Sequence, residues 1–290
     1  MGCKLFLDDE NNWWITGDKD SARFIEKMSV MMNLEKCTWD SSPRIIFLSN
    51  RDIYDAELLR QGWEFQDYRS AYIWYHKNFA DIICETKNDE VVYYLPDDYW
   101  NICFSLWSVY RKIINNGGMP FHSALIEIGG QGILISAPSN TGKSTCCRRI
   151  PSPWKPLCDD EVLIVLDKQQ KYFAYPFPTW SSYISNPSDK SYNVQHSVPI
   201  SAIFFIKQSK IDKVTPLNKN QAAVFMYGSS AETMRRYWVL SNREDLIKGQ
   251  RLKIFNNSVE MSKCIPAFQL EASLDGRFWE EIGKAINLNF

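Results

Sequence analysis

The chain has 290 residues, of which 45% are hydrophobic and 23% are charged. This composition is that of an ordinary folded protein, and the length suits one large domain or two smaller ones. The formal net charge of −1 gives no electrostatic basis for nucleic acid as a main partner. The sequence contains no apolar run long enough to cross a bilayer, so we expect no membrane partner either.

The first 95 residues are predicted to form an α+β module without a chemical motif. Strand patterns occur at residues 4–7, 13–16, 44–49, 71–75, 79–85 and 90–95. Apolar residues at helical spacing predict one helix that includes residues 24–32. The segment Leu95-Pro96-Asp97-Asp98 breaks this pattern, so we place a domain boundary near Pro96. An exposed strand edge in this module could pair with a peptide.

Residues 96–290 are predicted to form a second domain, which begins with a helix over residues 99–114. Strands are expected at residues 122–128, 132–136, 155–158, 162–166, 171–175, 202–206 and 266–271. Further helices are expected at residues 143–149, at 218–239 with a break at Gly228-Ser229, and at 275–286. The Pro- and Ser-rich stretch from Pro176 to Pro199 predicts a long loop, either a lid over substrate or a passive connection.

One stretch organises this second domain. Residues Ala137 to Thr145 read Ala-Pro-Ser-Asn-Thr-Gly-Lys-Ser-Thr and stand between an expected strand and an expected helix. Strand, tight loop and helix are the context of a phosphate-binding loop, whose backbone N–H groups point at an anion. The usual pattern opens with Gly where this chain has Ala137, but Gly142, Lys143 and Ser144 are intact. The alternative is a helix cap that binds nothing.

The loop predicts a nucleotide and a metal. We expect Lys143 to neutralise the β- and γ-phosphates, and Ser144 to offer its hydroxyl to Mg²⁺. The residues expected at the nucleotide are Ala137, Ser139, Asn140, Thr141, Gly142, Lys143, Ser144 and Thr145.

Two adjacent acids follow at a suitable distance. Asp159 and Asp160 come sixteen and seventeen residues after Lys143, at the end of an expected strand. One carboxylate there can hold Mg²⁺, and the other can accept a proton from an attacking hydroxyl. The alternative is a solvated turn, but a nearby cation makes two adjacent acids easier to tolerate. His122 opens a neighbouring strand and is either structural or part of the same site.

A cation that stabilises the transition state could come from any of five arginines, Arg148, Arg149, Arg235, Arg236 and Arg243. The Arg235-Arg236 pair is preferred because Arg148 and Arg149 are expected to face solvent or the next strand. Eight scattered cysteines without a Cys-x-x-Cys pair fit neither a zinc site nor a small disulfide framework. They are typical of reduced cytosolic thiols, and the N-terminus lacks a signal-peptide pattern, so we expect a cytoplasmic protein.

Three segments together resemble the core of the HPr kinase/phosphorylase family, which shares its nucleotide-binding core with phosphoenolpyruvate carboxykinases. They are His122-Ser-Ala-Leu-Ile, the stretch from Gly132 to Thr145, and Cys158-Asp-Asp-Glu-Val. The whole chain looks more like the small HPr kinase-related proteins found beside ribosomally made, modified peptides. These include the lasso-peptide kinases and the SynChlorMet cassette protein.

The resemblance implies an α/β fold with a P-loop core of the HPr kinase C-terminal and phosphoenolpyruvate-carboxykinase type. It implies an ATP- and Mg²⁺-dependent kinase that acts on a Ser or Thr hydroxyl of a peptide or small protein. Asp159 is then the catalytic base, Asp160 joins Ser144 at the metal, and Lys143 and His122 act at the phosphates or substrate. The Gly-rich signature of the bifunctional enzymes is missing, so the resemblance does not extend to phosphorylase activity or to HPr as substrate.

Other functions remain open from the residues alone. The chain could phosphorylate a small molecule such as free serine, or it could be a nucleotide-binding scaffold in a peptide-modification complex. The phosphate donor could also be GTP or pyrophosphate instead of ATP. A homo-oligomer is compatible with the sequence, which does not decide the oligomeric state.

Overall fold

The computed structural model describes residues 2–17, 19, 22–40, 42–48, 63–67, 71–76, 81–86, 106–107, 109–138, 141–178, 191–240 and 244–287. The fold is mixed α/β, as the sequence predicts. It divides into two compact units. Unit 1 comprises Met1–Lys112, Trp180–Gln195 and Arg236–Ile247, and unit 2 comprises Ile113–Thr179, His196–Arg235 and Lys248–Phe290. The boundary expected near Pro96 lies outside the described residues and stays a prediction.

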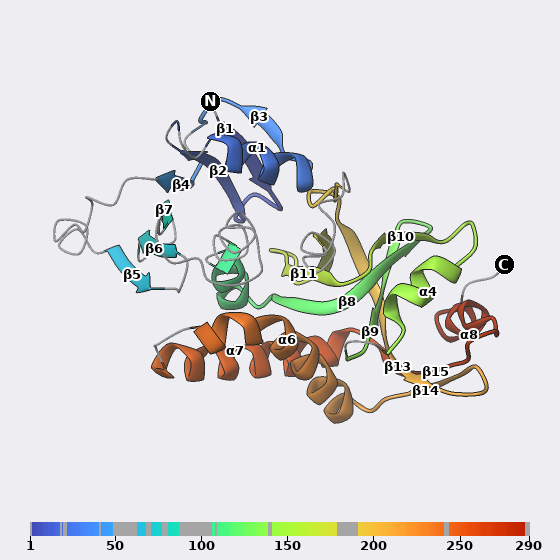
Figure 1. The fold of residues 1–290 in the computed structure, drawn as a ribbon. Coiled ribbons are helices and arrows are strands. Elements are labelled where there is room, and N and C mark those ends of the chain that lie inside the picture. The colour runs from blue at the N-terminus through green and yellow to red at the C-terminus, as the bar shows by residue number, and fades with distance from the viewer. Residues whose placement is uncertain are drawn as a thin grey trace. The chain divides into compact units, whose positions relative to one another are not determined.

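Unit 1 contains a seven-stranded sheet in the order β3-β1-β2-β4-β7-β6-β5 (Figure 1). Its strands are β1 (Gly2–Phe6), β2 (Asn12–Gly17), β3 (Glu35–Cys37), β4 (Arg44–Leu48), β5 (Trp63–Asp67), β6 (Ala71–His76) and β7 (Asp81–Thr86). Phe24 and Met28 of helix α1 (Ala22–Met31) are buried. The Phe24 and Phe47 rings meet edge-on, with their centroids 4.6 Å apart. The sequence patterns missed β3 and β5, and the strand expected at residues 90–95 lies outside the described residues.

Unit 2 is built on an eight-stranded sheet. Its strands are β8 (Met119–Ile128), β9 (Gln131–Ser136), β10 (Lys155–Cys158), β11 (Glu161–Leu166), β12 (Tyr172–Phe177), β13 (Val198–Gln208), β14 (Lys213–Pro216) and β15 (Ala267–Ala272). Most neighbouring strands are antiparallel, but β13 runs parallel to both β9 and β15. The carboxyl ends of these three strands therefore meet at one edge, which is where ligands bind in many α/β proteins.

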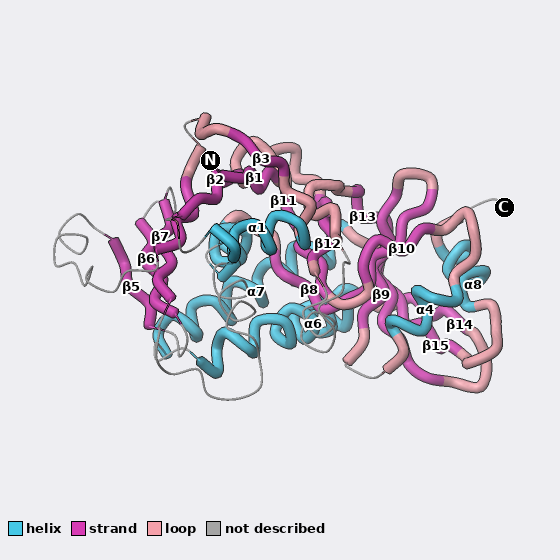
Figure 2. Tube along the Cα trace, turned by 45° about the horizontal axis from the view of Figure 1, so that its top comes forward, coloured by secondary structure: helices cyan, strands magenta, loops and turns pink. Residues whose placement is uncertain are grey.

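Helices cover both faces of the strands β9, β13 and β15 (Figures 1 and 2). The helices α4 (Lys143–Arg149) and α8 (Phe278–Ala285) pack on one face through Cys146, Cys147, Phe278 and Ile282. The other face meets α6 (Lys219–Leu240), whose Ser229 hydrogen-bonds Ser136 of β9. Helix α7 (Glu244–Cys264) contacts α6 through Phe255 and Tyr227, whose ring centroids lie 6.0 Å apart.

The break expected in α6 at Gly228-Ser229 is wrong, because α6 is one continuous helix. A glycine inside a helix costs only about 1 kcal/mol relative to alanine. Packing on both sides of Gly228 outweighs that cost, since Met226, Ser230 and Met234 are all buried. Among the described residues, no helix combines the length and the apolar composition needed to cross a bilayer.

Candidate functional site

The loop between β9 and α4 turns directly into the helix. Gly142 has a φ of +116°, a backbone conformation that residues with a Cβ atom rarely adopt, so glycine is required there. The Thr141 N–H donates to the Pro138 carbonyl at 3.3 Å, and the Cys146 N–H donates to the Gly142 carbonyl at 2.9 Å. The expected site residues Ser139 and Asn140 lie outside the described residues. The described part is a tight turn that places Lys143 first in the helix.

Lys143 folds back beneath this loop. Its ammonium donates to the Ala137 carbonyl at 2.6 Å and to the Pro138 carbonyl at 3.3 Å, and the residue is 6% exposed. Burial lowers the pKa of Lys143, and the carboxylates of Asp160 and Glu232 act in the opposite direction. The loop therefore holds a buried cation with neutral carbonyl oxygens, which phosphate oxygens could replace.

His122 joins the cation to one of the two predicted acids. Its Nε2 lies 2.7 Å from the Lys143 Nζ, and its Nδ1 lies 3.5 Å from the Asp160 Oδ1. This arrangement follows from strand register, because β8 and β11 pair His122 with Glu161, the residue after Asp160. A neutral imidazole protonated on Nδ1 accepts from Lys143 and faces Asp160 with its N–H. The structure thus brings together Lys143, His122 and Asp160.

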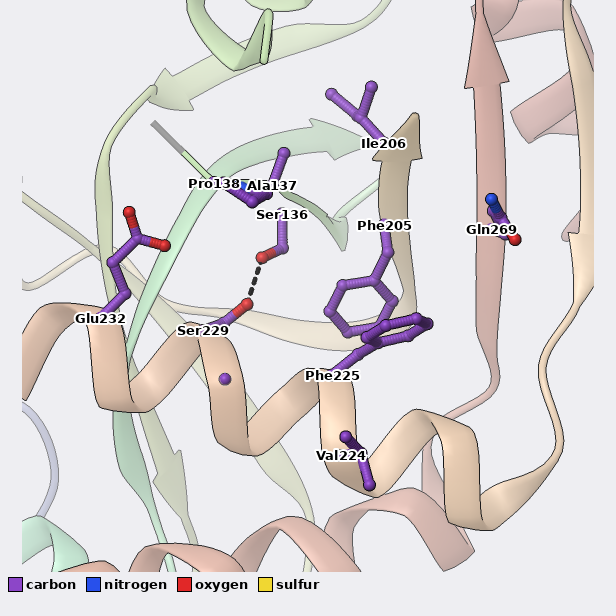
Figure 3. Close-up of a pocket in the computed structure, with 11 residues that line it drawn as sticks. Ser136, Ala137, Pro138, Phe205, Ile206, Val224, Phe225, Ser229, Glu232 and Gln269 are labelled. Carbon is purple, nitrogen blue, oxygen red and sulfur yellow. Dashed lines mark hydrogen bonds between the residues drawn. The ribbon is translucent and has the colours of Figure 1, made fainter. Parts of the chain in front are cut away.

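Sequence reasoning missed a second carboxylate at this histidine. Glu232 of α6 has its Oε1 3.5 Å from the His122 Nε2, although 110 residues separate the two in the chain. A hydroxyl pair positions this part of α6: Ser136 Oγ donates to the His122 carbonyl at 3.0 Å, which leaves Ser229 to donate to Ser136 (Figure 3). No local motif marks Glu232, because its place depends on how α6 packs.

Two cavities adjoin the loop in unit 2. One, of about 340 Å³, lies on the α4 side between Thr141, Gly142 and Thr145 and the ends of β13 and β15. The other, of about 420 Å³, lies on the α6 side beside Ala137 and Pro138. Both volumes are in the range of small-molecule pockets. The residues that pair with Lys143 therefore stand next to spaces that could hold a nucleotide and an acceptor.

A comparison with protein families gives a match to the SynChlorMet cassette protein ScmC over residues 82–287. The chain belongs to the ScmC family. This confirms the resemblance seen in the sequence. Among solved structures, the Hpr(Ser) kinase/phosphatase from Coxiella burnetii is 14% identical, with 34% of this chain and 71% of that chain covered and a TM-score of 0.25. That likeness is too low to support an argument, and no curated protein matches the chain.

The remaining predicted residues of this ScmC-family chain lie around the same loop. Ser144 and Asp159 are partly buried, and the charge of Asp159 also acts on Lys143. The described residues contain no group of three or more His, Cys, Asp or Glu side chains arranged to hold a metal. A Mg²⁺ site in a phosphotransferase does not need such a group, because it uses one or two carboxylates together with substrate phosphates and water.

The arginines differ in where they lie. Arg149 donates to the Ser273 carbonyl at 2.8 Å and stacks over the Phe278 ring, so it ties α4 to the α8 region. Arg148 and Arg235 are exposed, and Arg243 lies outside the described residues. The preference for the Arg235-Arg236 pair stays a prediction. The loop predicted from Pro176 to Pro199 is shorter at both ends, because β12 continues to Phe177 and β13 begins at Val198. Residues 179–190 lie outside the described residues, so the role of this loop as a lid stays a prediction.

Proposed function

We propose that this chain is an ATP- and Mg²⁺-dependent kinase that phosphorylates a Ser or Thr hydroxyl of a peptide or small protein during peptide maturation. One observation carries the proposal: the Lys143 ammonium lies 2.7 Å from His122, which has Asp160 3.5 Å away on its other nitrogen. A lysine at the start of the helix after such a loop, close to a carboxylate, is the combination that phosphoryl transfer uses.

Lys143 would bind the phosphates by exchanging partners. Its present acceptors include the Ala137 and Pro138 carbonyls, and anionic phosphate oxygens would accept more strongly than these neutral groups. The cavity on the α4 side suits the nucleoside, because it adjoins Gly142 and Thr145 and contains the polar side chains of Gln208 and Ser209. It also lies at the carboxyl ends of parallel strands, where nucleotides bind in related architectures.

The donor set suits Mg²⁺. Ser144 and Asp160 offer hard oxygen ligands, and Mg²⁺ prefers such ligands to nitrogen or sulfur. When bound there, the ion would neutralise charge on the phosphate oxygens. Asp160 also faces the His122 ring, so its orientation is set from the protein side.

Asp159 would act as the base. It would accept the proton of the acceptor hydroxyl as that oxygen forms its bond to the γ-phosphorus. The bond from the γ-phosphorus to the bridging oxygen breaks, and its electron pair leaves with ADP. His122 would steady the γ-phosphate or the acceptor, and Lys143 would balance the charge that spreads over the phosphate oxygens.

The test is a transfer assay with γ-labelled ATP and Mg²⁺ that offers peptides encoded near this gene and, separately, free serine. We expect label on a peptide hydroxyl. Lys143→Ala should reduce transfer by about 100-fold or more, whereas Lys207→Ala, which alters a lysine side chain that is 62% exposed, should not. Normal transfer by Lys143→Ala would contradict the site. Label on free serine alone would indicate a small-molecule kinase, and tight nucleotide binding without transfer would indicate a scaffold.

A further inference from the structure

The cavity on the α6 side of the loop has an aromatic wall (Figure 3). Phe205 of β13 and Phe225 of α6 place their ring centroids 5.1 Å apart, and Val224 lies on the same helix beside them. Ala137 and Pro138, the first two residues of the phosphate-binding loop, form another side of the cavity. A space of about 420 Å³ with this lining suits a large apolar group.

Two apolar side chains of this wall are exposed to solvent. Val224 is 59% exposed and Phe225 is 44% exposed, although Ala222 and Met226 of the same helix are buried. Apolar side chains gain free energy when a ligand removes them from water. Their exposure beside a cavity therefore favours an apolar ligand over a charged one at this end.

The other end of the cavity is acidic and leads to the transfer site. Glu232 follows Phe225 by seven residues, two helical turns along the same side of α6 (Figure 3). Its Oε1 is 3.5 Å from the His122 Nε2. The cavity thus runs along α6 from an aromatic wall to Glu232, whose carboxylate neighbours the histidine that contacts Lys143.

We infer that this cavity binds the acceptor peptide through a large apolar side chain next to the phosphorylated Ser or Thr, which itself lies beyond the Glu232 end of the cavity, toward His122 and Lys143. The inference rests on the proposed kinase function and names its substrate class. The nucleoside is better served by the α4-side cavity, which adjoins Gly142 and Thr145 and contains more polar groups. Free serine has no apolar side chain to place against Phe205 and Phe225, so the cavity favours a peptide.

A glycine offers a way to fill the cavity without disturbing the helix. Gly228 lines the cavity between Phe225 and Glu232, and a Cβ atom placed on it would meet no atom within 4 Å. Gly249 of α7 is also exposed and also has open space for a Cβ atom, but it does not line the cavity. Gly228→Leu and Gly249→Leu are therefore a matched pair, since each adds the same side chain to an open helical position.

The experiment compares N-acetyl-Phe-Ser-Phe-amide with N-acetyl-Gly-Ser-Gly-amide. Calorimetry without nucleotide measures the binding of each peptide, and a second titration measures ATP. We expect wild type and Gly249→Leu to bind the Phe peptide at least about tenfold more tightly than the Gly peptide. Gly228→Leu should lose this preference and keep its affinity for ATP.

Two results would overturn the inference. Equal affinity of wild type for the two peptides would show that the cavity does not select an apolar side chain. A loss of ATP affinity in Gly228→Leu but not in Gly249→Leu would assign the cavity to the nucleoside. Failure of the kinase proposal looks different, because wild type would then bind the Phe peptide in calorimetry but would bind no ATP or transfer no phosphate.

Discussion

The two faces of the unit 2 sheet use alternate residues of the same strands for different purposes. On the face that α4 and α8 cover, Ile133 and Ile135 of β9 and Phe204 of β13 are fully buried in one apolar cluster. On the α6 face, Ser136 and Phe205 line a cavity. Because side chains alternate across a strand, one residue step separates the packed core from a position that lines a cavity.

The difference between the faces lies in what closes them. On the α4 side, Arg149 donates a hydrogen bond to the Ser273 carbonyl and stacks over the Phe278 ring. On the α6 side the contact with β9 is a hydroxyl pair, Ser136 with Ser229, next to the bare backbone of Gly228. A polar contact and a missing side chain keep helix and sheet together but leave room between them. The α4 face is thus held by apolar packing and by Arg149, whereas helix and sheet leave an open cavity between them on the α6 face.

The largest effect is expected from the predicted base. Asp159→Asn should lower turnover by about 100- to 10,000-fold, because the amide cannot accept the proton of the acceptor hydroxyl. The affinity for ATP should stay within a few-fold of wild type, and single-turnover transfer with γ-labelled ATP separates the two quantities. Asp9→Asn, at an exposed turn of unit 1, serves as the control. Equal loss of ATP affinity and turnover would instead make Asp159 a binding residue.

Phe204 and Phe205 are neighbours in β13 but point to opposite faces of the sheet. Replacing each with alanine compares how much the two faces contribute to the free energy of unfolding. Phe204→Ala should lower the free energy of unfolding by about 3–5 kcal/mol, because it leaves a void against Phe268, whose ring lies 5.0 Å away. Phe205→Ala should cost less, because this side chain already borders a cavity and the change enlarges it. Urea unfolding of both variants measures the difference. A larger loss for Phe205→Ala would show that the α6 face is the better packed one.

The strand and the helix on either side of the loop could be predicted because their signals are local. Residues 137–145 carry the motif, and α4 begins and ends where the sequence predicts. Helix α7 was not predicted, because its buried residues form a narrow and partly polar stripe. Ile254, Ser258 and Met261 belong to this stripe. Its contacts are with residues far away in the sequence: the Asn257 side chain donates to the Ile114 carbonyl at 2.8 Å and to the Gly118 carbonyl at 2.9 Å. Such contacts, like the approach of Glu232 to His122, have no local pattern.

Glu232 should affect the alkaline limb of the pH profile. Burial lowers the pKa of Lys143, so activity that needs its ammonium is complete below this lowered pKa and is lost as the pH rises through it. The Glu232 carboxylate raises the pKa of Lys143, so Glu232→Gln should move the alkaline limb of kcat/KM for ATP, which reports the free enzyme, to lower pH. Glu260→Gln, at an acid side chain that is 64% exposed, should leave the limb in place. An unchanged limb in Glu232→Gln would mean that the carboxylate does not act on Lys143 in the free enzyme.

The smallest effect is expected on stability when Gly228 is replaced by alanine. This change separates what glycine costs the helix from the room it leaves in the cavity. Gly228→Ala should stabilise the protein by about 0.5–1 kcal/mol, because alanine restricts the unfolded chain and its Cβ atom meets nothing within 4 Å. Gly249→Ala should give a similar gain, measured as a rise in Tm by calorimetry. If Gly228→Ala alone is destabilising, then α6 lies closer to the sheet than the cavity allows. Equal gains would show that glycine at position 228 is not needed for packing, so its cost to the helix would be offset only by the room it leaves for a ligand.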